Sequence, residues 1–280
     1  MHNDYEAMSR IVKSNCIASF TFLVWETLVT SGDEVEYIWP KPTQSFFKWL
    51  YFFLRYFNML AQLWHQFAIP RIISGHISNQ VCKAWYIYTI IITQAMATAV
   101  EIILATRVYA LYNKSRRVGG LLYALILIEI IAMTANSIHT IPIIEHAVIC
   151  VLVKPPQQIL YYSISVFTTQ SALMGLTLIK HFFAMRNGWG RTPLVSLLMR
   201  DGIAVYLVMF VLIASTVIYC LSGNELTVIV FFWLLSLLSS TGCRLIVNMQ
   251  RLATMAERHS TSGVQLSTEI ALDVSCPTLE

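Results

Sequence analysis

The sequence predicts an all-α protein whose seven helices cross a lipid bilayer in a receptor-like layout. The 280 residues are 56% hydrophobic and 12% charged, and the mean hydropathy is +0.62. Soluble globular domains carry about twice this share of charged residues, so the composition indicates a polytopic membrane protein. Apolar runs long enough to span the hydrocarbon core as helices occur throughout the chain. These runs are residues 14–30, 46–69, 84–110, 119–138, 159–183, 202–221 and 226–247.

The third run, residues 84–110, shows most clearly how such a helix is oriented. It is apolar apart from Gln94, Glu101 and Arg107. Gln94 and Glu101 lie about two helical turns apart, so they share one face of the helix. Polar groups are costly in hydrocarbon, and we therefore expect this face to contact other helices.

The segments outside the apolar runs divide the chain into three parts. Residues 1–13 form a short polar tail on the outside, and residues 14–252 hold the seven-helix domain. Residues 253–280 lack the apolar content needed to fold alone, so we expect a disordered cytosolic tail there. Residues 32–40 are acidic and end on aromatics and a proline, which is typical of a loop at the membrane interface.

The distribution of basic residues predicts an outside amino terminus and a cytosolic carboxyl terminus. In this arrangement twelve Lys and Arg residues face the cytosol and five face outward, and Arg55 and Arg107 within the membrane complete the 19. An excess on the inner side is what the positive-inside rule requires. The first helix alone favours the opposite orientation, because Arg10 and Lys13 precede it. We follow the total and expect a multi-pass protein of the plasma membrane.

Four charged residues fall within the predicted spans at similar depth, and they are Glu26, Arg55, Glu101 and Glu129. A charge in hydrocarbon is costly unless it is paired, so we expect Arg55 to contact Glu26 or Glu101. With three acids for one central arginine, one carboxyl group, that of Glu129, is expected to carry a proton. The cluster could act as a proton or cation relay or as a switch. A static polar lock that holds the helices in register explains the same residues.

The second run carries a polar face, formed by Arg55, Asn58, Gln62 and His65 at spacings of three, four and three residues. This face should be turned inward, because lipid does not solvate it. His65 could act there as a ligand or proton carrier, or it could be a packed residue without such a role.

Two of the six cysteines would lie on the outer, oxidising side of the membrane. They are Cys82 at the start of the third helix and Cys150 in the loop after the fourth. A disulfide between them would tether that loop across the mouth of the bundle. Two free thiols are the alternative.

Basic residues near the inner helix ends form a candidate surface for a cytosolic partner, namely Arg107, Arg116, Arg117 and Arg191. Arg107, followed by Val108 and Tyr109, lies where seven-helix receptors keep an arginine for G-protein coupling. However, Thr106 stands where those receptors have an acid. Snorkelling of Arg107 to lipid phosphate is the alternative.

Several kinds of site have no counterpart in the sequence. The cysteines and histidines form no pattern typical of a metal site, and no HExxH or GxSxG motif occurs. Membrane orientation explains the basic residues at the helix ends, so nucleic acid is not implied. We therefore expect no catalytic, cofactor-binding or metal-binding residue and no enzymatic activity.

Four blocks of the sequence together resemble a large fungal family, typical of mushroom-forming basidiomycetes, that has an N-terminal domain of unknown function. The blocks are residues 32–40 with Arg55-Tyr56, residues 107–113, residues 200–202, and Ser239-Ser240 with Arg244 and Asn248. The resemblance covers residues 14–252 and implies a receptor-like bundle of seven helices, an outer cysteine pair similar to Cys82 and Cys150, and a variable cytosolic tail. Many members have Asp in the first helix where this chain has Glu26. No activity, ligand or catalytic residue is implied.

These observations favour a receptor-like sensor that binds a small or apolar ligand near its outer end and meets a cytosolic signalling protein. A proton- or cation-coupled transporter or channel that uses Glu101, Glu129 and Arg55 is the alternative. A purely structural membrane protein is the third possibility. Analogy of topology carries little weight in choosing among them.

Overall fold

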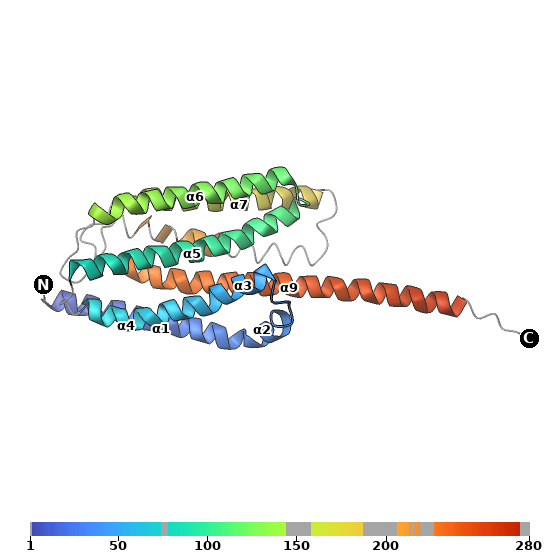
Figure 1. The fold of residues 1–280 in the computed structure, drawn as a ribbon, viewed down its shortest axis with the longest axis horizontal. Coiled ribbons are helices and arrows are strands. Elements are labelled where there is room, and N and C mark those ends of the chain that lie inside the picture. The colour runs from blue at the N-terminus through green and yellow to red at the C-terminus, as the bar shows by residue number, and fades with distance from the viewer. Residues whose placement is uncertain are drawn as a thin grey trace, which may run out of the picture.

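The computed structural model describes residues 2–73, 78–143, 158–186, 206–212, 214–215, 217–218 and 227–274. The described chain is helical, as expected, and its elements run in one series from α1 to α9 (Figure 1). Their bounds are α1 His2–Val29, α2 Ser31–Tyr37, α3 Phe46–Phe52, η1 Phe53–Phe57, α4 Asn58–Ile73, α5 Asn79–Leu111, α6 Arg116–Ile143, α7 Gln158–Arg186 and α9 Thr227–Val274.

Three described helices are long and apolar enough to cross a membrane. They are Gln80–Leu111 in α5, Arg116–His139 in α6 and Val228–Arg251 in α9. Each contains one of the predicted apolar runs almost entirely, which supports an integral membrane protein. Of the remaining runs, residues 202–221 lie only partly within the described residues. The full set of seven spans and the orientation of the termini stay predictions.

Helix α5 occupies the middle of the molecule. In Figure 1 it lies between α6 and α7 on one side and α1, α4 and α9 on the other. It contacts α6, α7 and α9, while α1 packs along α9 and α6 along α7. The fully buried apolar side chains come mainly from α5 and α9, and they include Met96, Val100, Ile103, Leu235, Leu238 and Ile246. A displacement of α5 would therefore affect both sides of the bundle.

Two regions expected to be irregular are helical. Helix α1 already begins at His2, so the polar tail predicted for residues 1–13 belongs to that helix from its second residue on. The loop expected over residues 32–40 contains α2. Asp33 and Glu34 lie in the first turn of α2, where acidic side chains favour a helix because they complement its dipole.

The predicted disordered tail also differs from the structure, because α9 continues without a break to Val274. The physical reason is local. Residues 253–274 contain a single glycine and no proline, the two residues that most strongly disfavour a helix interior. In Figure 1 this part of α9 projects beyond the bundle, at the end where α2 and α3 lie.

The second predicted helix, residues 46–69, is one helical rod with a wide turn in it. Helix α3 leads directly into η1, a π-helical turn, and η1 leads into α4. A π turn carries one extra residue, and such turns are frequent at functional sites. Arg55 lies within this turn and is almost fully buried.

Candidate functional site

The four charged residues predicted to form one cluster are divided among three separate pairs. The sequence suggested that Arg55 would contact Glu26 or Glu101. Arg55 instead forms an ion pair with Glu34 of α2. Glu26 pairs with Arg244 of α9, and Glu101 lies beside Glu129. The single-cluster prediction is therefore wrong. It assumed residues 32–40 to be a surface loop, and this excluded Glu34 as a partner.

The ion pair between Arg55 and Glu34 is shielded from solvent. Arg55 Nε lies 3.1 Å from Glu34 Oε2, and each side chain is only 3% exposed. The Glu34 carboxylate also accepts hydrogen bonds from Tyr56 Oη at 2.8 Å and from Trp39 Nε1 at 3.1 Å. Arg55 further donates from Nη1 to Thr30 Oγ1 at 3.0 Å. Buried charges need this degree of hydrogen bonding to offset the loss of hydration.

Glu26 and Arg244 join α1 to α9 by a two-pronged contact. Arg244 Nη2 donates to Glu26 Oε1 at 2.6 Å and Nε donates to Glu26 Oε2 at 3.1 Å. The arginine side chain is 57% exposed, unlike that of Arg55. Between the two ion pairs lies a polar cavity of about 290 Å³, lined by residues of α1, α2, α3, η1 and α9 that include Asp33, Ser239 and Asn248.

The remaining two acids meet in the core between α5, α6 and α7. Glu101 and Glu129 are fully buried, and their side chains interact with each other. Gln170 of α7 donates from Nε2 to Glu101 Oε1 at 2.9 Å. The Thr169 hydroxyl lies beside the Glu129 carboxyl group. This group of four residues is called the carboxyl pair site below.

The polar face predicted for residues 55–65 is turned inward, as expected. Arg55, Asn58, Gln62 and His65 are all buried. Asn58 Nδ2 donates to the Leu235 carbonyl at 3.0 Å, and Gln62 Nε2 donates to Ser236 Oγ at 2.7 Å, so this face binds α9. The structure therefore gives Asn58 and Gln62 a role in helix association.

His65 ends this face in an aromatic environment. Its ring lies 5.5 to 6.2 Å, between centroids, from those of Tyr88, Phe231, Phe232 and Trp85. Among the described residues, neither ring nitrogen of His65 has a hydrogen-bond partner, and the same holds for Trp85 Nε1. Buried polar atoms are usually paired, so this location has spare hydrogen-bonding capacity.

Next to His65 an aromatic groove of about 670 Å³ runs between α4 and α5. It is lined by side chains that are apolar apart from Arg71, with Phe57, Leu60, Ala61, Trp64, Ala68 and Ile72 on one wall and Val81, Ala84, Trp85, Tyr88 and Ile92 on the other. Leu60 and Trp64 are more than half exposed, so the groove opens on the outside of the bundle. In a membrane this opening would face lipid.

The candidate partner residues divide between the surface and the core. Arg116 and Arg117 are exposed at the start of α6. Arg107 instead donates from Nη2 to the Leu245 carbonyl of α9 at 2.7 Å, so it points into the bundle and not to lipid phosphate. Arg191 lies outside the described residues.

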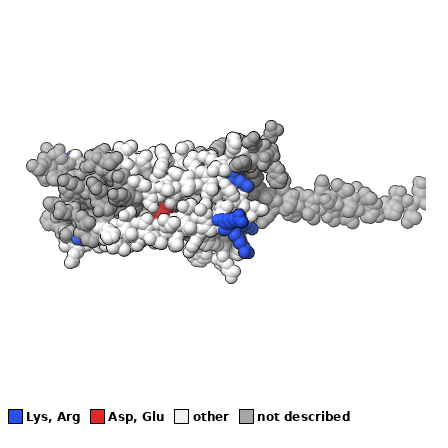
Figure 2. All heavy atoms as spheres, turned by 90° about the horizontal axis from the view of Figure 1, so that it is seen from above, with Lys and Arg blue, Asp and Glu red and all other residues white. Residues whose placement is uncertain are grey.

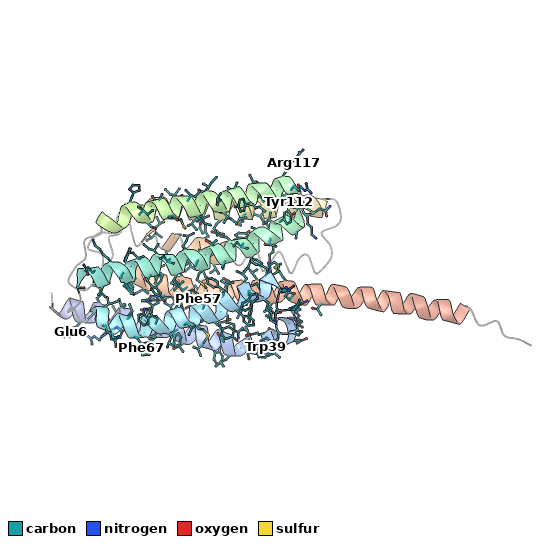
Figure 3. The ribbon with its side chains drawn as sticks, in the orientation of Figure 1. Glu6, Trp39, Phe57, Phe67, Tyr112 and Arg117 are labelled. Atoms are coloured by element: carbon teal, nitrogen blue, oxygen red, sulfur yellow. The ribbon has the colours of Figure 1, made fainter. Side chains whose placement is uncertain are left out.

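These exposed arginines lie at one end of the molecule, which we call the basic end. Tyr112 and Arg117 lie there together with Trp39, whereas Glu6 and Phe67 lie at the opposite end (Figure 3). Figure 2 shows Lys and Arg side chains gathered at the end from which α9 projects.

Two further predictions concern cysteines and metals. Cys82 is buried in the first turns of α5, but Cys150 lies outside the described residues, so the disulfide stays a prediction. Within the described part of the chain, no three His, Cys, Asp or Glu side chains are grouped so that they could hold a metal ion.

Sequence reasoning missed three partners in these clusters: Glu34, Gln170 and Arg244. Glu34 lies in residues 32–40, which were expected to form a loop, and Arg244 was noted only within a block of the family resemblance. Gln170 carries no charge, and only its position in the middle of a span, within the polar stretch of residues 168–171, could have drawn attention to it.

Comparison with known proteins adds one finding. The model of a family described as "Family of unknown function (DUF6533)" matches residues 15–60. The match includes Glu26, Glu34 and Arg55, hence the buried ion pair and one half of the exposed pair. Comparison with curated proteins and with solved structures gives no match.

Proposed function

We propose that this integral membrane protein is a seven-helix, receptor-like sensor and not an enzyme. Its ligand would be a small apolar molecule that carries one hydrogen-bonding group. The observation that carries the proposal is the aromatic groove between α4 and α5. Binding sites for small molecules are typically concave and mostly apolar, with a few polar groups that fix the orientation of the ligand.

The chemistry around the groove favours a ligand of this class. Trp64, Trp85 and Tyr88 supply large flat surfaces for an apolar body. The unpartnered indole nitrogen of Trp85, with His65 behind it, is suited to bind a hydroxyl or carbonyl group. Because the groove opens on the outside of the bundle, such a ligand would enter from the lipid phase.

A route from the groove to the basic end exists within the described helices. Helix α4 lines the groove and continues into η1, where Arg55 binds Glu34 of α2. Asn58 and Gln62 join the same rod to α9, which leaves the bundle at the basic end. A ligand that shifts α4 would therefore move α2 and α9, and the exposed Arg116 and Arg117 would meet a cytosolic signalling protein there. The proposal also includes an outside amino terminus, a cytosolic carboxyl terminus and location in the plasma membrane.

The test begins with ligand binding to the protein in nanodiscs. Tryptophan emission is followed while straight-chain alcohols, fatty acids and sterols are added. The variant Ala84→Trp fills the groove from a residue exposed on its wall, and Ala124→Trp on exposed α6 is the matched control. We expect saturable binding of one ligand class by the wild type and the control, and at least tenfold weaker binding by Ala84→Trp. Equal binding by all three proteins would rule out the groove.

Signalling is tested by isolating the tagged protein from its host membranes in mild detergent and identifying the retained proteins by mass spectrometry. Recovery of a signalling protein that increases with ligand and is lost in the double reversal Arg116→Glu, Arg117→Glu would support the receptor-like function. A partner-free protein would contradict it.

A proton- or cation-coupled transporter is the second candidate, and the carboxyl pair site favours it. Buried acids in membrane helices commonly lie on ion or proton pathways. Arg55, which the sequence placed on the same path, belongs to the separate ion pair with Glu34. pH-dependent flux through reconstituted liposomes, abolished by Glu101→Gln, would support this candidate over the sensor.

A further inference from the structure

We propose that Glu101 and Glu129 form a proton-binding site that locks α5 to α6 and that Gln170 of α7 completes it. Such a site would lock the two helices whether the protein senses a ligand or transports one, so it goes beyond the function proposed above. It rests on the donors and acceptors around the two carboxyl groups.

The first step concerns the contact between the two acids. Both side chains are fully buried, and they interact directly. An ionised carboxylate has acceptor atoms only, so two of them in contact repel each other. A single proton on either oxygen turns this contact into an O–H···O hydrogen bond between an acid and a carboxylate, which is a strong bond.

The second step counts the available donors. Gln170 is 6% exposed, and its amide nitrogen already donates to Glu101 Oε1. The Thr169 hydroxyl lies beside Glu129 but donates to the Ser165 carbonyl of its own helix at 3.4 Å. By distance and angle, Glu101 Oε2, Glu129 Oε1, Glu129 Oε2 and Gln170 Oε1 accept no hydrogen bond from the described residues. Buried acceptors without donors are costly. A bound proton supplies the missing donor, and Gln170 Oε1 is a further acceptor beside it.

The third step concerns charge. Glu101 and Glu129 are the titratable groups that α5 and α6 contribute to the site, and α7 contributes only the uncharged Gln170 and Thr169. Within the described residues, no lysine, arginine or histidine interacts with either carboxyl group. Neutralisation must therefore come from a bound species, and a shared proton fits the direct contact of the two carboxyl groups.

The position of the site in the bundle gives the proton a structural effect. Glu101 lies sixteen residues after Trp85, which places it about 160° around α5 from that groove residue. One face of α5 thus lines the aromatic groove while the opposite face carries the carboxyl pair site. When the proton leaves, two like charges face each other across α5 and α6, and α5 is pushed away from α6 towards the groove.

Infrared spectroscopy of the protein in nanodiscs tests the proposal directly. We expect a C=O stretching band of a protonated carboxylic acid at neutral pH, shifted in D2O. It should be lost in the double variant Glu101→Gln, Glu129→Gln and kept in Glu26→Gln, whose carboxylate is paired with Arg244. A spectrum without this band, or a band that persists in the double variant, would overturn the proposal.

Thermal unfolding at several pH values gives an independent readout. The shared proton joins α5 to α6 only in the folded protein, so the melting temperature should fall as pH rises through the range in which the band disappears. Because glutamine cannot titrate, the double variant should lack this fall. If instead the melting temperature depends on NaCl against choline chloride and not on pH, the site holds a metal cation and the proton assignment is wrong.

Discussion

Arg55 and Glu34 form an ion pair that connects the π turn η1 to the short helix α2, with 3.1 Å between Nε and Oε2. Both residues lie within the stretch that matches the family of unknown function. A buried charge pair needs further hydrogen bonds to be tolerated, and Tyr56, Trp39 and Thr30 supply three of them. We infer that the pair is the structural centre of the matched stretch, since it fixes α2 against the wide turn of the second predicted span.

Removal of one partner of this pair should be strongly destabilising. The variant Glu34→Gln leaves the Arg55 charge buried without its counter-ion, and such changes cost about 3–5 kcal/mol. Chemical denaturation or thermal unfolding in mild detergent measures the effect. The matched control is Glu36→Gln, because Glu36 is an exposed residue of the same helix. A loss no larger than that of the control would show that the pair carries little stability.

Replacement of both partners should recover much of this loss. In Glu34→Gln, Arg55→Met no uncompensated charge remains, and the methionine fills part of the volume of the arginine. Buried ion pairs replaced by packed uncharged residues are often as stable as the original. We expect the double variant to unfold at a higher temperature than Glu34→Gln alone. A double variant that is less stable than the single one would mean that Arg55 has stabilising contacts other than its charge pair.

The second ion pair should behave differently, because it is accessible. Arg244 is 57% exposed, and exposed pairs contribute about 0–1 kcal/mol. The variant Glu26→Gln should therefore reduce the unfolding free energy far less than Glu34→Gln, and the reduction should shrink further at high salt. Parallel unfolding experiments at low and high NaCl check both statements. A loss as large as that of Glu34→Gln would indicate that the membrane interface shields this pair.

The sequence predicted which residues point inward better than it predicted which residues pair. Helical spacing alone placed Arg55, Asn58, Gln62 and His65 on one inward face, and all four are buried. Depth along a helix axis, however, does not give the direction in which a long side chain reaches. The extra residue of η1 changes the direction in which the side chains near Arg55 point around the helix axis. Hydrophobic periodicity does not locate a π turn.

The sequence did not predict the side-chain partners of Glu34, Glu101 and Glu129 for a related reason. Glu34 became available only because residues 31–37 form a helix, whereas their composition suggested a loop. Glu101 was expected to face other helices, but its contact with Gln170 depends on the packing of α7 against α5 and α6. Pairing between helices distant in sequence is a tertiary property, so composition and periodicity in a single chain do not determine it.

Gly242 is the position where α9 approaches its neighbours most closely among the glycines described. A Cβ atom added there would lie 2.8 Å from Leu54 Cδ1 and 3.2 Å from Val100 Cγ2. Overpacking of this kind costs about 1–3 kcal/mol, so Gly242→Val should lower the melting temperature. The control is Gly120→Val on α6, where an added Cβ meets no atom within 4 Å. Equal melting temperatures for the two variants would show that α9 shifts to accommodate the side chain.

Ser239 should stabilise the π turn by binding one of its backbone carbonyls. In an α-helix the Asn58 N–H would donate to the Leu54 carbonyl, but here it donates to the Arg55 carbonyl. The Leu54 carbonyl instead accepts from Ser239 Oγ at 2.6 Å, and Ser239 is buried. The variant Ser239→Ala removes this hydrogen bond, and the loss of a typical intramolecular hydrogen bond costs about 0.5–1.5 kcal/mol.

Thr241→Ala is the matched control, because the Thr241 hydroxyl donates to the Leu237 carbonyl of its own helix. In the regular α-helical pattern a backbone N–H already donates to that carbonyl. The loss of the Thr241 hydroxyl bond should therefore cost under about 0.5 kcal/mol. Unfolding of the two variants in the same detergent gives the comparison. If Ser239→Ala is the more destabilising, a side chain of α9 maintains the wide turn that holds Arg55 against Glu34. If the two losses are equal, η1 persists without help from α9.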